Sequence, residues 1–371
     1  MRIIVIGTGI AGAAAAYQLA RLGADVVVAD AGLTGAATDA GAGIVSPWAS
    51  RKLDDPAMEL AARAAAFYRT LGEQLAADGR PGGSFEVVGG MVVSADEGEL
   101  AATHDRITAR AAEWPDAGSV DLLDPAQARG LFPPLAPGLG AVHLSGAGRV
   151  DGRRLRETLL RAAAGLGARA MAGRAELHLT GGRVAGARIA GELVWADRVV
   201  VAAGAWSPPL LAPLGARLPV EPQRGQICHF DVPGADTAAW PVVLPVSSHY
   251  LLAFPGSRVV AGATREDGSG FDHRVTAAGQ HEVLEHALAV APGLGGATLA
   301  ETRVGFRPAT PDGAPLLGPV AGHPEVIVLT GFGPSGLTLG PYAGRLAAAL
   351  ALDRPPPIDV SGLRPGRFSD R

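Results

Sequence analysis

The first thirty residues limit most strongly what this chain can fold into. An apolar run, Met1–Ile6, breaks at a glycine-rich turn over residues 7–12 (GTGIAG). An Ala-rich stretch then leads to a second apolar run, Asp25–Ala29, which ends at Asp30. The order strand, glycine turn, helix, strand and acid is the fingerprint of a dinucleotide-binding unit.

Each part of this fingerprint has a physical role. Gly7 permits the sharp turn out of the strand, and Gly9 lets a pyrophosphate approach the backbone at the helix N-terminus. Gly12 allows close packing of the helix on the strand, and Asp30, 18 residues further on, is placed to bind a ribose diol.

Two other interpretations of this segment are open. A glycine-rich turn also occurs in ordinary α/β proteins, but that reading leaves Asp30 unexplained. The stretch from Arg2 through Ala16 resembles a secretory signal peptide, yet cleavage there would destroy a complete βαβ unit.

Composition narrows the class of protein. The 371 residues suggest two or three domains, and 48% apolar residues suffice for a sizeable core. A net charge of −4 without a basic stripe argues against nucleic acid as a partner. The single Cys228 excludes an intrachain disulfide and a multi-cysteine metal site, and no metal site is predicted from the scattered histidines. We therefore expect a cytoplasmic protein without a membrane span.

Buried parallel-type strands occupy the N-terminus, the middle and the C-terminus, and antiparallel-type strands lie between them. This order predicts an α/β and α+β fold, with a discontinuous Rossmann-like domain and an inserted mixed-sheet domain. The predicted ranges are 1–80, 140–215 and 301–371 for the first domain, and 81–139 and 216–300 for the second. Predicted helices cover 56–78, 97–114, 152–166, 276–291 and 337–352; predicted strands include 85–94, 170–179, 198–203, 242–244, 250–254, 258–263 and 325–330.

Six blocks, taken in order, resemble the D-amino-acid oxidase superfamily, which includes glycine oxidase, sarcosine oxidase and D-amino-acid dehydrogenases. They are GTGIAGAAAAYQLA at 7–20, GAATDAGAGIV at 35–45, GRVDGRRLRETLLRAAAGLGA at 148–168, ADRVVVAAGAWS at 196–207, GFRPATPDGAPLLGP at 305–319 and TGFGPSGLTLGPYAGRLAA at 330–348.

The resemblance implies that FAD binds the first domain and that the second domain binds the substrate. The second glycine turn opens a helix whose N-terminal dipole suits a reduced flavin. The cofactor-binding residues implied in this way are Gly7, Gly9, Ile10, Ala11, Gly12, Asp30, Ala37, Thr38, Gly43, Ile44, Ala175, Ala203, Gly204, Trp206, Arg307, Gly333, Pro334, Ser335, Gly336, Leu337 and Thr338.

Similarity to the family also places a substrate pocket. Arg307, in Gly-Phe-Arg-Pro, matches the arginine that holds the substrate carboxylate, and its planar fork suits that group. Tyr250 matches a tyrosine that contacts the same carboxylate, although a half-buried strand aromatic is nearly as good an interpretation. For Trp48, His249 and Arg224 we favour structural roles.

The implied reaction oxidises a C–N bond of a D-amino acid or an N-substituted glycine. Hydride transfer to flavin N5 gives an imine, which water hydrolyses. Relatives attach FAD through a cysteine near the position of Gly305 or through a histidine in the small-residue loop, and neither residue is present. We therefore expect non-covalent FAD. Pro334 replaces a second arginine of glycine oxidases, which argues against strict glycine oxidase activity.

Several alternatives stay open at this stage. The protein could be an NAD(P)-dependent dehydrogenase, the flavin-binding subunit of a heteromeric complex, or a flavoprotein with a structural role. The electron acceptor, oxygen or another, and a homo-oligomeric state or partner subunit are not encoded in any motif.

Overall fold

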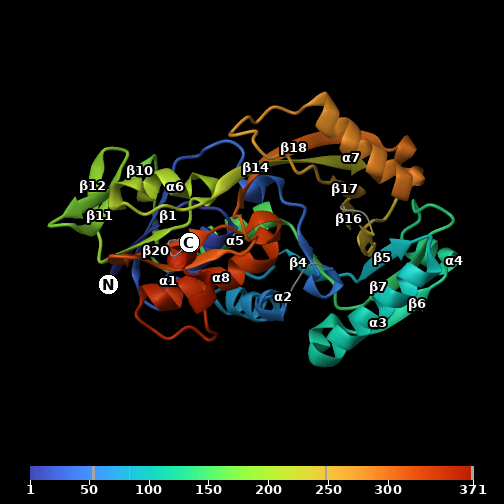
Figure 1. Ribbon diagram of the computed structural model, residues 1–371, viewed down its shortest axis with the longest axis horizontal. Coiled ribbons are helices and arrows are strands. Elements are labelled where there is room, and N and C mark those ends of the chain that lie inside the picture. The colour runs from blue at the N-terminus through green and yellow to red at the C-terminus, as the bar shows by residue number, and fades with distance from the viewer. Residues whose placement is uncertain (52–54, 83, 247–248, 369–371) are drawn as a thin grey trace.

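The computed structural model describes residues 1–51, 55–82, 84–246 and 249–368 (Figure 1). The part of the molecule that is predicted to bind a dinucleotide is built on a six-stranded sheet. Its order is β19-β20-β13-β1-β2-β9, and β1 pairs in parallel with both β2 and β13. The bounds are β1 Arg2–Ile6, β2 Asp25–Asp30, β9 Arg169–Ala172, β13 Arg198–Val201, β19 Leu316–Val320 and β20 His323–Thr330.

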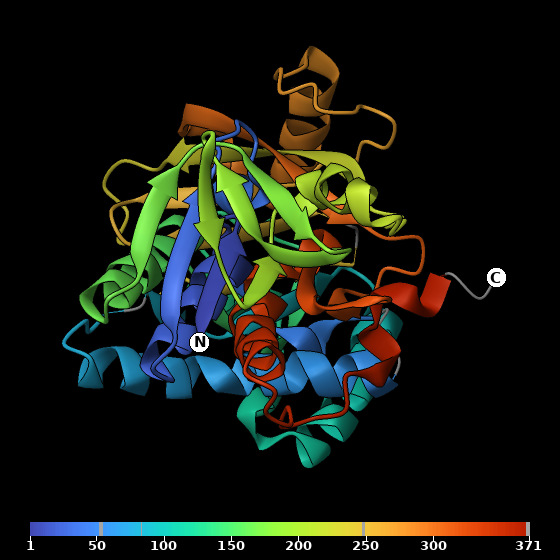
Figure 2. The same ribbon diagram turned by 90° about the vertical axis from the view of Figure 1, so that its left-hand side faces the viewer.

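Alternating side chains bury this sheet on both faces. Ile3, Val5 and Val200 pack with helices, whereas Ile4 and Val199 pack against a second, three-stranded sheet. The helices are α1 (Ile10–Arg21), α2 (Asp55–Ala77), α5 (Gly152–Gly165) and α8 (Gly336–Ala351), and the sheet comprises β10 (Ala175–Thr180), β11 (Arg183–Ile189) and β12 (Glu192–Trp195). Figure 2 shows the three-stranded sheet in front of the central strands and α2 running across the bottom of the view.

Small residues bring the two glycine-turn helices together. A Cβ at Gly344 of α8 would lie 2.7 Å from Ala14 Cβ on α1, and one at Gly340 would lie 2.9 Å from Ile10 Cγ2. Glycine at these two positions lets α1 and α8 lie in close contact. Because α1 follows β1 and α8 follows β20, and both strands run parallel to β13, the two helices begin at the same end of the sheet.

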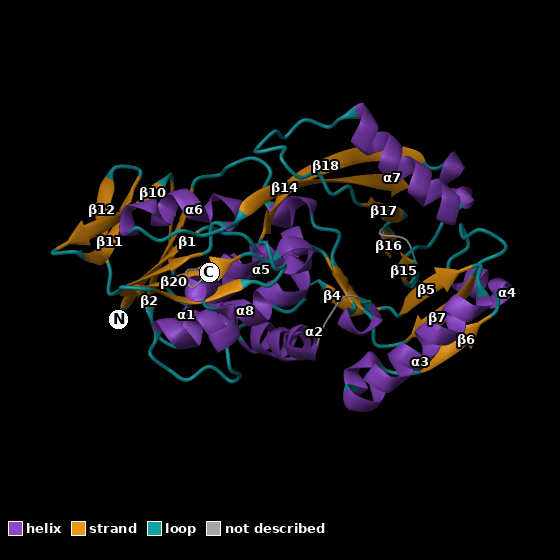
Figure 3. Cartoon of the chain, viewed as in Figure 1, coloured by secondary structure: helices purple, strands orange, loops and turns teal. Residues whose placement is uncertain are grey.

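An eight-stranded mixed sheet forms the other part of the molecule. Helix α7 lies outside it in Figure 3, with α3 and α4 beside β5, β6 and β7. The order is β18-β14-β17-β16-β15-β5-β7-β6, and among its described strands the β15–β5 pair is parallel while the other pairs are antiparallel. The bounds are β5 Gly90–Ser94, β6 Val120–Leu123, β7 Gly140–Leu144, β14 Glu221–Asp231, β15 Val242–Pro245, β16 Tyr250–Phe254, β17 Arg258–Gly262, β18 Thr298–Ala309, α3 Glu97–Glu113, α4 Pro125–Leu131 and α7 Ala277–Val290.

The alternation in β16 decides which face of this sheet meets the rest of the molecule. Leu251 and Ala253 pack with α4 and α7, whereas Leu252 and Phe254 belong to the opposite face, on which Tyr250 also lies. That opposite face packs against the loop that carries Ala42 and Ile44, next to the nucleotide-binding part.

The predicted fold class is confirmed by these two sheets, and some local predictions are wrong. Residues 85–94 form neither a single strand nor a hairpin, because β4 (Phe85–Val87) pairs with β8 (Gly148–Val150) and β5 belongs to the larger sheet. Residues 170–179 are divided between β9 and β10, because Gly173 turns the chain at φ +136°. The sheets also cross two expected domain limits, since β7 and β18 belong to the eight-stranded sheet. The domain ranges stay a prediction.

Candidate active site

A cavity of about 510 Å³ lies between the two sheets. Its walls include the carboxyl ends of four neighbouring strands of the six-stranded sheet, at Ile6, Ala29, Ala202 and Leu329, and residues of β14 and β18. The chain leaves β1 toward β2 on one side, and β13 pairs with β1 on the other. The cavity therefore lies at the topological switch point, where parallel α/β sheets bind nucleotides.

The turn between β1 and α1 has the shape that the glycine pattern predicts. Gly7 has φ +103°, and a Cβ there would lie 2.4 Å from the carbonyl oxygen of Ala202. A Cβ at Gly12 would lie 2.0 Å from the Gly7 carbonyl oxygen, so Gly12 serves helix–strand packing. At Gly9 the nearest atom would be Thr38 Oγ1 at 3.4 Å, which leaves the backbone there open to the cavity.

Asp30 is held at the cavity by the same turn. Its Oδ2 accepts hydrogen bonds from the Thr8 backbone N–H at 2.6 Å and from Thr8 Oγ1 at 2.5 Å, and its Oδ1 accepts one from Gly32 N–H at 2.7 Å. A carboxylate has about four acceptor positions, so capacity remains for a ribose hydroxyl.

The small-residue loop closes a second wall of the cavity. The Ile10 N–H donates to Thr38 Oγ1 at 2.9 Å, which ties the start of α1 to this loop. A Cβ at Gly305 of β18 would lie 2.8 Å from Ala40 Cβ, so the loop passes directly against β18. The loop thus joins the two sheets where the cavity lies.

The second glycine turn supplies a third wall. Residues Gly333–Ser335 form a short 3₁₀ helix that leads into α8. The Tyr68 hydroxyl donates to the Leu337 carbonyl oxygen, and Thr338 Oγ1 donates to the Ile44 carbonyl oxygen at 3.0 Å. Both contacts fix the first turn of α8, which begins at the cavity.

The cavity brings together most residues that the sequence singled out. Of the predicted cofactor residues, Gly12, Ser335 and Thr338 are not among those that line it, and their role in binding stays a prediction. The predicted residues that line it are Gly7, Gly9, Ile10, Ala11, Asp30, Ala37, Thr38, Gly43, Ile44, Ala175, Ala203, Gly204, Trp206, Tyr250, Arg307, Gly333, Pro334, Gly336 and Leu337.

Arg307 and Tyr250 reach the cavity from the eight-stranded sheet, each across a glycine. A Cβ at Gly225 of β14 would lie 2.6 Å from Arg307 Cζ, Nη1 and Nη2, so the guanidinium lies over Gly225. A Cβ at Gly262 of β17 would lie 2.9 Å from the Tyr250 hydroxyl oxygen. Both glycines were missed from the sequence, because nothing in it announces which strands become neighbours.

The electrostatics keep both groups in their binding forms. Burial raises the pKa of the Tyr250 hydroxyl, which is therefore a hydrogen-bond donor at neutral pH. Burial lowers the pKa of the Arg307 guanidinium, which nevertheless stays charged because an arginine titrates far above neutral pH. Arg307 Nη1 donates to the Thr264 carbonyl oxygen at 2.9 Å, and other donors of the fork remain for a ligand.

The residues for which structural roles were expected lie outside this cavity's lining. Arg224 pairs with Glu266 at 2.6 Å and with Asp272 at 3.0 Å. His249 stacks on His286 with ring centroids 3.9 Å apart, and burial lowers the pKa of His249 to about 4.

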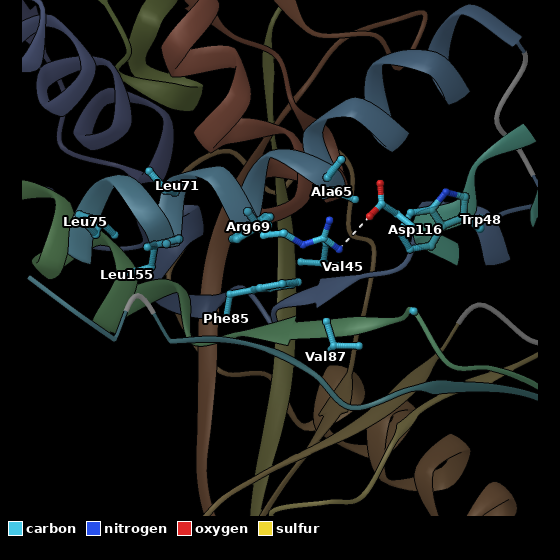
Figure 4. Close-up of a pocket in the computed structure, with 14 residues that line it drawn as sticks. Val45, Trp48, Ala65, Arg69, Leu71, Leu75, Phe85, Val87, Asp116 and Leu155 are labelled. Atoms are coloured by element: carbon cyan, nitrogen blue, oxygen red, sulfur yellow. Dashed lines mark hydrogen bonds and ion pairs between the residues drawn. The ribbon is translucent and has the colours of Figure 1, made fainter. Parts of the chain in front are cut away.

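Trp48 lines a second cavity, of about 340 Å³ (Figure 4). The two cavities lie on opposite sides of β3 (Ile44–Val45), since Ile44 lines the larger and Val45 the smaller. Arg69 and Asp116 form an ion pair at 3.0 Å over the smaller one, whose walls are otherwise mainly apolar. It contains none of the predicted catalytic residues.

The larger cavity fits FAD by its donor set. One end offers a helix N-terminus, a bare Gly9 and the Asp30 carboxylate, as an adenosine diphosphate moiety requires. The eight-stranded sheet adds Arg307 and Tyr250 to the wall, and the 3₁₀ turn before α8 lies against β18, which carries Arg307. In the described ranges no group of metal-ligating side chains is found, and no helix is long and apolar enough to span a membrane.

Comparison with known proteins agrees with this geometry. Residues 2–350 match the DAO family profile, described as FAD dependent oxidoreductase. The chain belongs to the DAO family. It is therefore an oxidoreductase of that family, and the predicted relationship is confirmed.

Three relatives cover nearly the whole chain. The crystal structure of iminodiacetate oxidase from Chelativorans sp. BNC1 is 47% identical, with a TM-score of 0.95 over 98% of this chain and 99% of that one. The uncharacterized oxidoreductase YurR of Bacillus subtilis (strain 168) is 44% identical over 98% of both chains. Glycine oxidase of Pseudomonas putida is 31% identical, also over 98% of both.

Proposed function

We propose that this protein uses non-covalently bound FAD to oxidise a C–N bond of a small carboxylated amine, either a D-amino acid or an N-substituted glycine. The observation that carries this proposal is the presence of Arg307 and Tyr250 in the same cavity as the Gly7–Gly12 turn. A carboxylate anchor and a dinucleotide site at the two ends of one cavity suit the oxidation of an amino acid.

Several features support non-covalent attachment. The described residues that line the cavity include no cysteine and no histidine. Cys228 is buried in β14, and burial raises the pKa of its thiol. The described wall of the cavity therefore offers neither the cysteine nor the histidine through which relatives attach FAD covalently.

In the proposed reaction, Arg307 binds the substrate carboxylate in a bidentate manner, and Tyr250 donates a hydrogen bond to the same group. Together they orient the substrate so that its reacting C–H bond faces the cofactor. FAD, when bound, accepts the two electrons and the hydrogen that leave this carbon. The amine nitrogen loses a proton as the C=N bond forms, and water hydrolyses the imine to a carbonyl compound and an amine.

Stacked aromatic rings help to exclude water from one side of the cavity. Trp206, which lines it, stacks on Phe271 with centroids 4.8 Å apart and meets the edge of Phe306 at 6.0 Å. Exclusion of water strengthens the ionic contact to the substrate carboxylate.

The names of the relatives favour N-substituted glycines within this class, because iminodiacetate oxidase and glycine oxidase are both named for compounds that contain a glycine unit. The FAD family match favours a flavin over the nicotinamide alternative. Three further parts of the proposal come from the sequence. We propose that the protein is cytoplasmic, that its electron acceptor is oxygen or another oxidant, and that it acts as a homo-oligomer or with a partner subunit.

The first experiment is an absorbance spectrum of the purified protein before and after acid precipitation. Flavin bands that pass into the supernatant support non-covalent FAD, whereas their absence, or flavin retained in the pellet, would contradict it. The second is an anaerobic screen of D-, L- and N-alkyl amino acids for bleaching of those bands. If a flavin-loaded protein is bleached by none of them, the amine oxidation proposal is wrong.

A further inference from the structure

Arg265 is a second arginine at the substrate end of the large cavity, and the sequence did not single it out. It lines the cavity with Arg307 and Tyr250, and its side chain is exposed. Its positive charge acts on the pKa of Arg307, of Tyr250 and of His249, and Arg307 and Tyr250 line the same cavity as Arg265. Among the residues that the structure describes, none forms a hydrogen bond or an ion pair with its guanidinium.

The backbone on both sides fixes the direction of this side chain. Glu266 N–H donates to the Arg224 carbonyl oxygen and Arg224 N–H to the Glu266 carbonyl oxygen, both at 3.0 Å, which forms an antiparallel bridge. Thr264 Oγ1 donates to Glu266 Oε1 at 2.7 Å, so these two side chains share one side of the segment. Extended residues alternate in direction, which turns Arg265 to the other side, toward the cavity.

The two acidic side chains that follow Arg265 in the sequence, Glu266 and Asp267, are already engaged. Glu266 accepts from both Arg224 and Gln226 in addition to Thr264. Asp267 Oδ1 accepts a hydrogen bond from Gln223 at 2.8 Å. Glu266 forms its ion pair with Arg224, and although its charge also acts on Arg307, it accepts no hydrogen bond from Arg307 or Arg265.

The acids that line the cavity lie elsewhere. They are Asp30 and Glu176, and both belong to the nucleotide end, where Gly173 N–H donates to the Asp30 carbonyl oxygen. Two guanidinium groups thus share the substrate end, and no carboxylate of the described residues forms an ion pair with either of them. A monoanionic substrate would neutralise only one of them.

We infer that Arg265 binds a second carboxylate of the substrate, and that the preferred substrate is a small dicarboxylic amine. This inference rests on the proposed function. Arg307 and Tyr250 hold the carboxylate next to the reacting carbon, and Arg265 holds the one on the far side of the nitrogen. The simplest secondary amine of this class is iminodiacetate, whose second carboxylate lies one methylene beyond the nitrogen.

Binding without turnover tests the inference directly. Diglycolate has an ether oxygen in place of the amine and cannot be oxidised in this way, and methoxyacetate is its counterpart without the second carboxylate. Isothermal titration of the flavin-loaded protein should show diglycolate binding at least about tenfold more tightly than methoxyacetate. In Arg265→Gln this preference should fall to nearly one, and Arg265→Lys should restore part of it.

Kinetics give the second readout. The ratio of kcat/KM for iminodiacetate to that for sarcosine should fall about ten- to a hundredfold in Arg265→Gln, mainly through KM for iminodiacetate. Arg217→Gln is the matched control, because Arg217 is exposed and does not line the cavity. It should leave the ratio unchanged.

The outcomes separate this inference from the proposed function. One outcome is that Arg265→Gln lowers the affinity for diglycolate and methoxyacetate equally, and kcat/KM for iminodiacetate and sarcosine equally; another is that it changes none of these values. In either case Arg265 does not bind a second carboxylate, while the proposal of amine oxidation stands. If no amine is oxidised but the diglycolate preference depends on Arg265, the proposed function is wrong and the binding role of Arg265 stands. If diglycolate and methoxyacetate bind the wild-type protein equally, the inference is overturned.

Discussion

The two ends of the large cavity are built in different ways. At the proposed nucleotide end, the cavity wall is backbone that glycine exposes, and Gly7, Thr8 and Asp30 lie within one βαβ unit. At the proposed substrate end, polar side chains line the cavity, and Arg307 and Tyr250 come from two strands and lie 57 positions apart in the sequence. The first end depends on backbone shape and the second on strand register, so substitutions should affect them differently.

The largest effect is expected at Arg307. Arg307→Ala removes the proposed carboxylate anchor, and we expect kcat/KM for carboxylated amines to fall about a thousandfold, or roughly 4 kcal/mol, with a large rise in KM. Steady-state kinetics measure this, and the flavin content should stay near that of the wild type. Arg303→Ala is the control, because Arg303 lies on the same strand, pairs with Glu301 and does not line the cavity. A similar loss in both variants would remove Arg307 from the site.

Gly12→Ala tests the nucleotide end by its effect on the stability of the fold. The new Cβ would lie 2.0 Å from the Gly7 carbonyl oxygen, and this clash should cost about 3 kcal/mol of the free energy of unfolding. Urea denaturation measures the loss, and flavin content should fall with it. Gly72→Ala is matched to it, since Gly72 lies inside α2 and an added Cβ there would meet no atom within 4 Å, so this variant should be neutral or slightly stabilising. Equal stability of the two variants would contradict this view of the turn.

Acid should act on the eight-stranded sheet through His229. Burial, reinforced by Arg303, lowers the pKa of His229 to about 4, below its unfolded value near 6.5. The unfolded chain therefore binds the extra proton first, and stability is lost as the pH falls from about 6.5 toward 4.

Replacement of His229 measures how much this histidine contributes to the loss of stability in acid. In His229→Gln, the loss in the free energy of unfolding between pH 7 and pH 5 should be smaller by roughly 2 kcal/mol. Denaturation at the two pH values measures the difference. An unchanged loss would mean that other groups, such as His249, carry the acid sensitivity.

The smallest effect is expected at Gly225. In Gly225→Ala the added methyl group would lie 2.6 Å from the Arg307 guanidinium, which is the far end of a flexible side chain and can move away. We expect kcat/KM to fall about tenfold while the melting temperature changes little. If instead the protein unfolds and the remaining folded fraction has full activity, Gly225 serves the sheet rather than the arginine.

The sequence predicted the helices more accurately than it predicted the strand pairing. The helices over 97–114, 152–166 and 276–291 are found within one or two residues of their predicted ends, with side-chain caps at Asp96, Asp151 and Thr276. These elements are local, since periodicity and a capping residue specify them. The division of residues 85–94 between two sheets was not predictable, because it depends on pairing with β8 and β7, more than forty residues away.

The candidate site divides in the same way. By itself the sequence predicted the nucleotide end, because Gly7, Gly9, Gly12 and Asp30 lie within a single βαβ unit, in which Gly12 packs on Gly7 and Asp30 accepts a hydrogen bond from Thr8. A family pattern added Arg307 and Tyr250. Only the tertiary structure decided that Gly225 and Gly262 open the space for those two side chains, and that Arg265 joins them without a carboxylate partner among the described residues. The physical reason is that a sheet places residues by strand register, and strand register is fixed by contacts between distant segments rather than by any local run of residues.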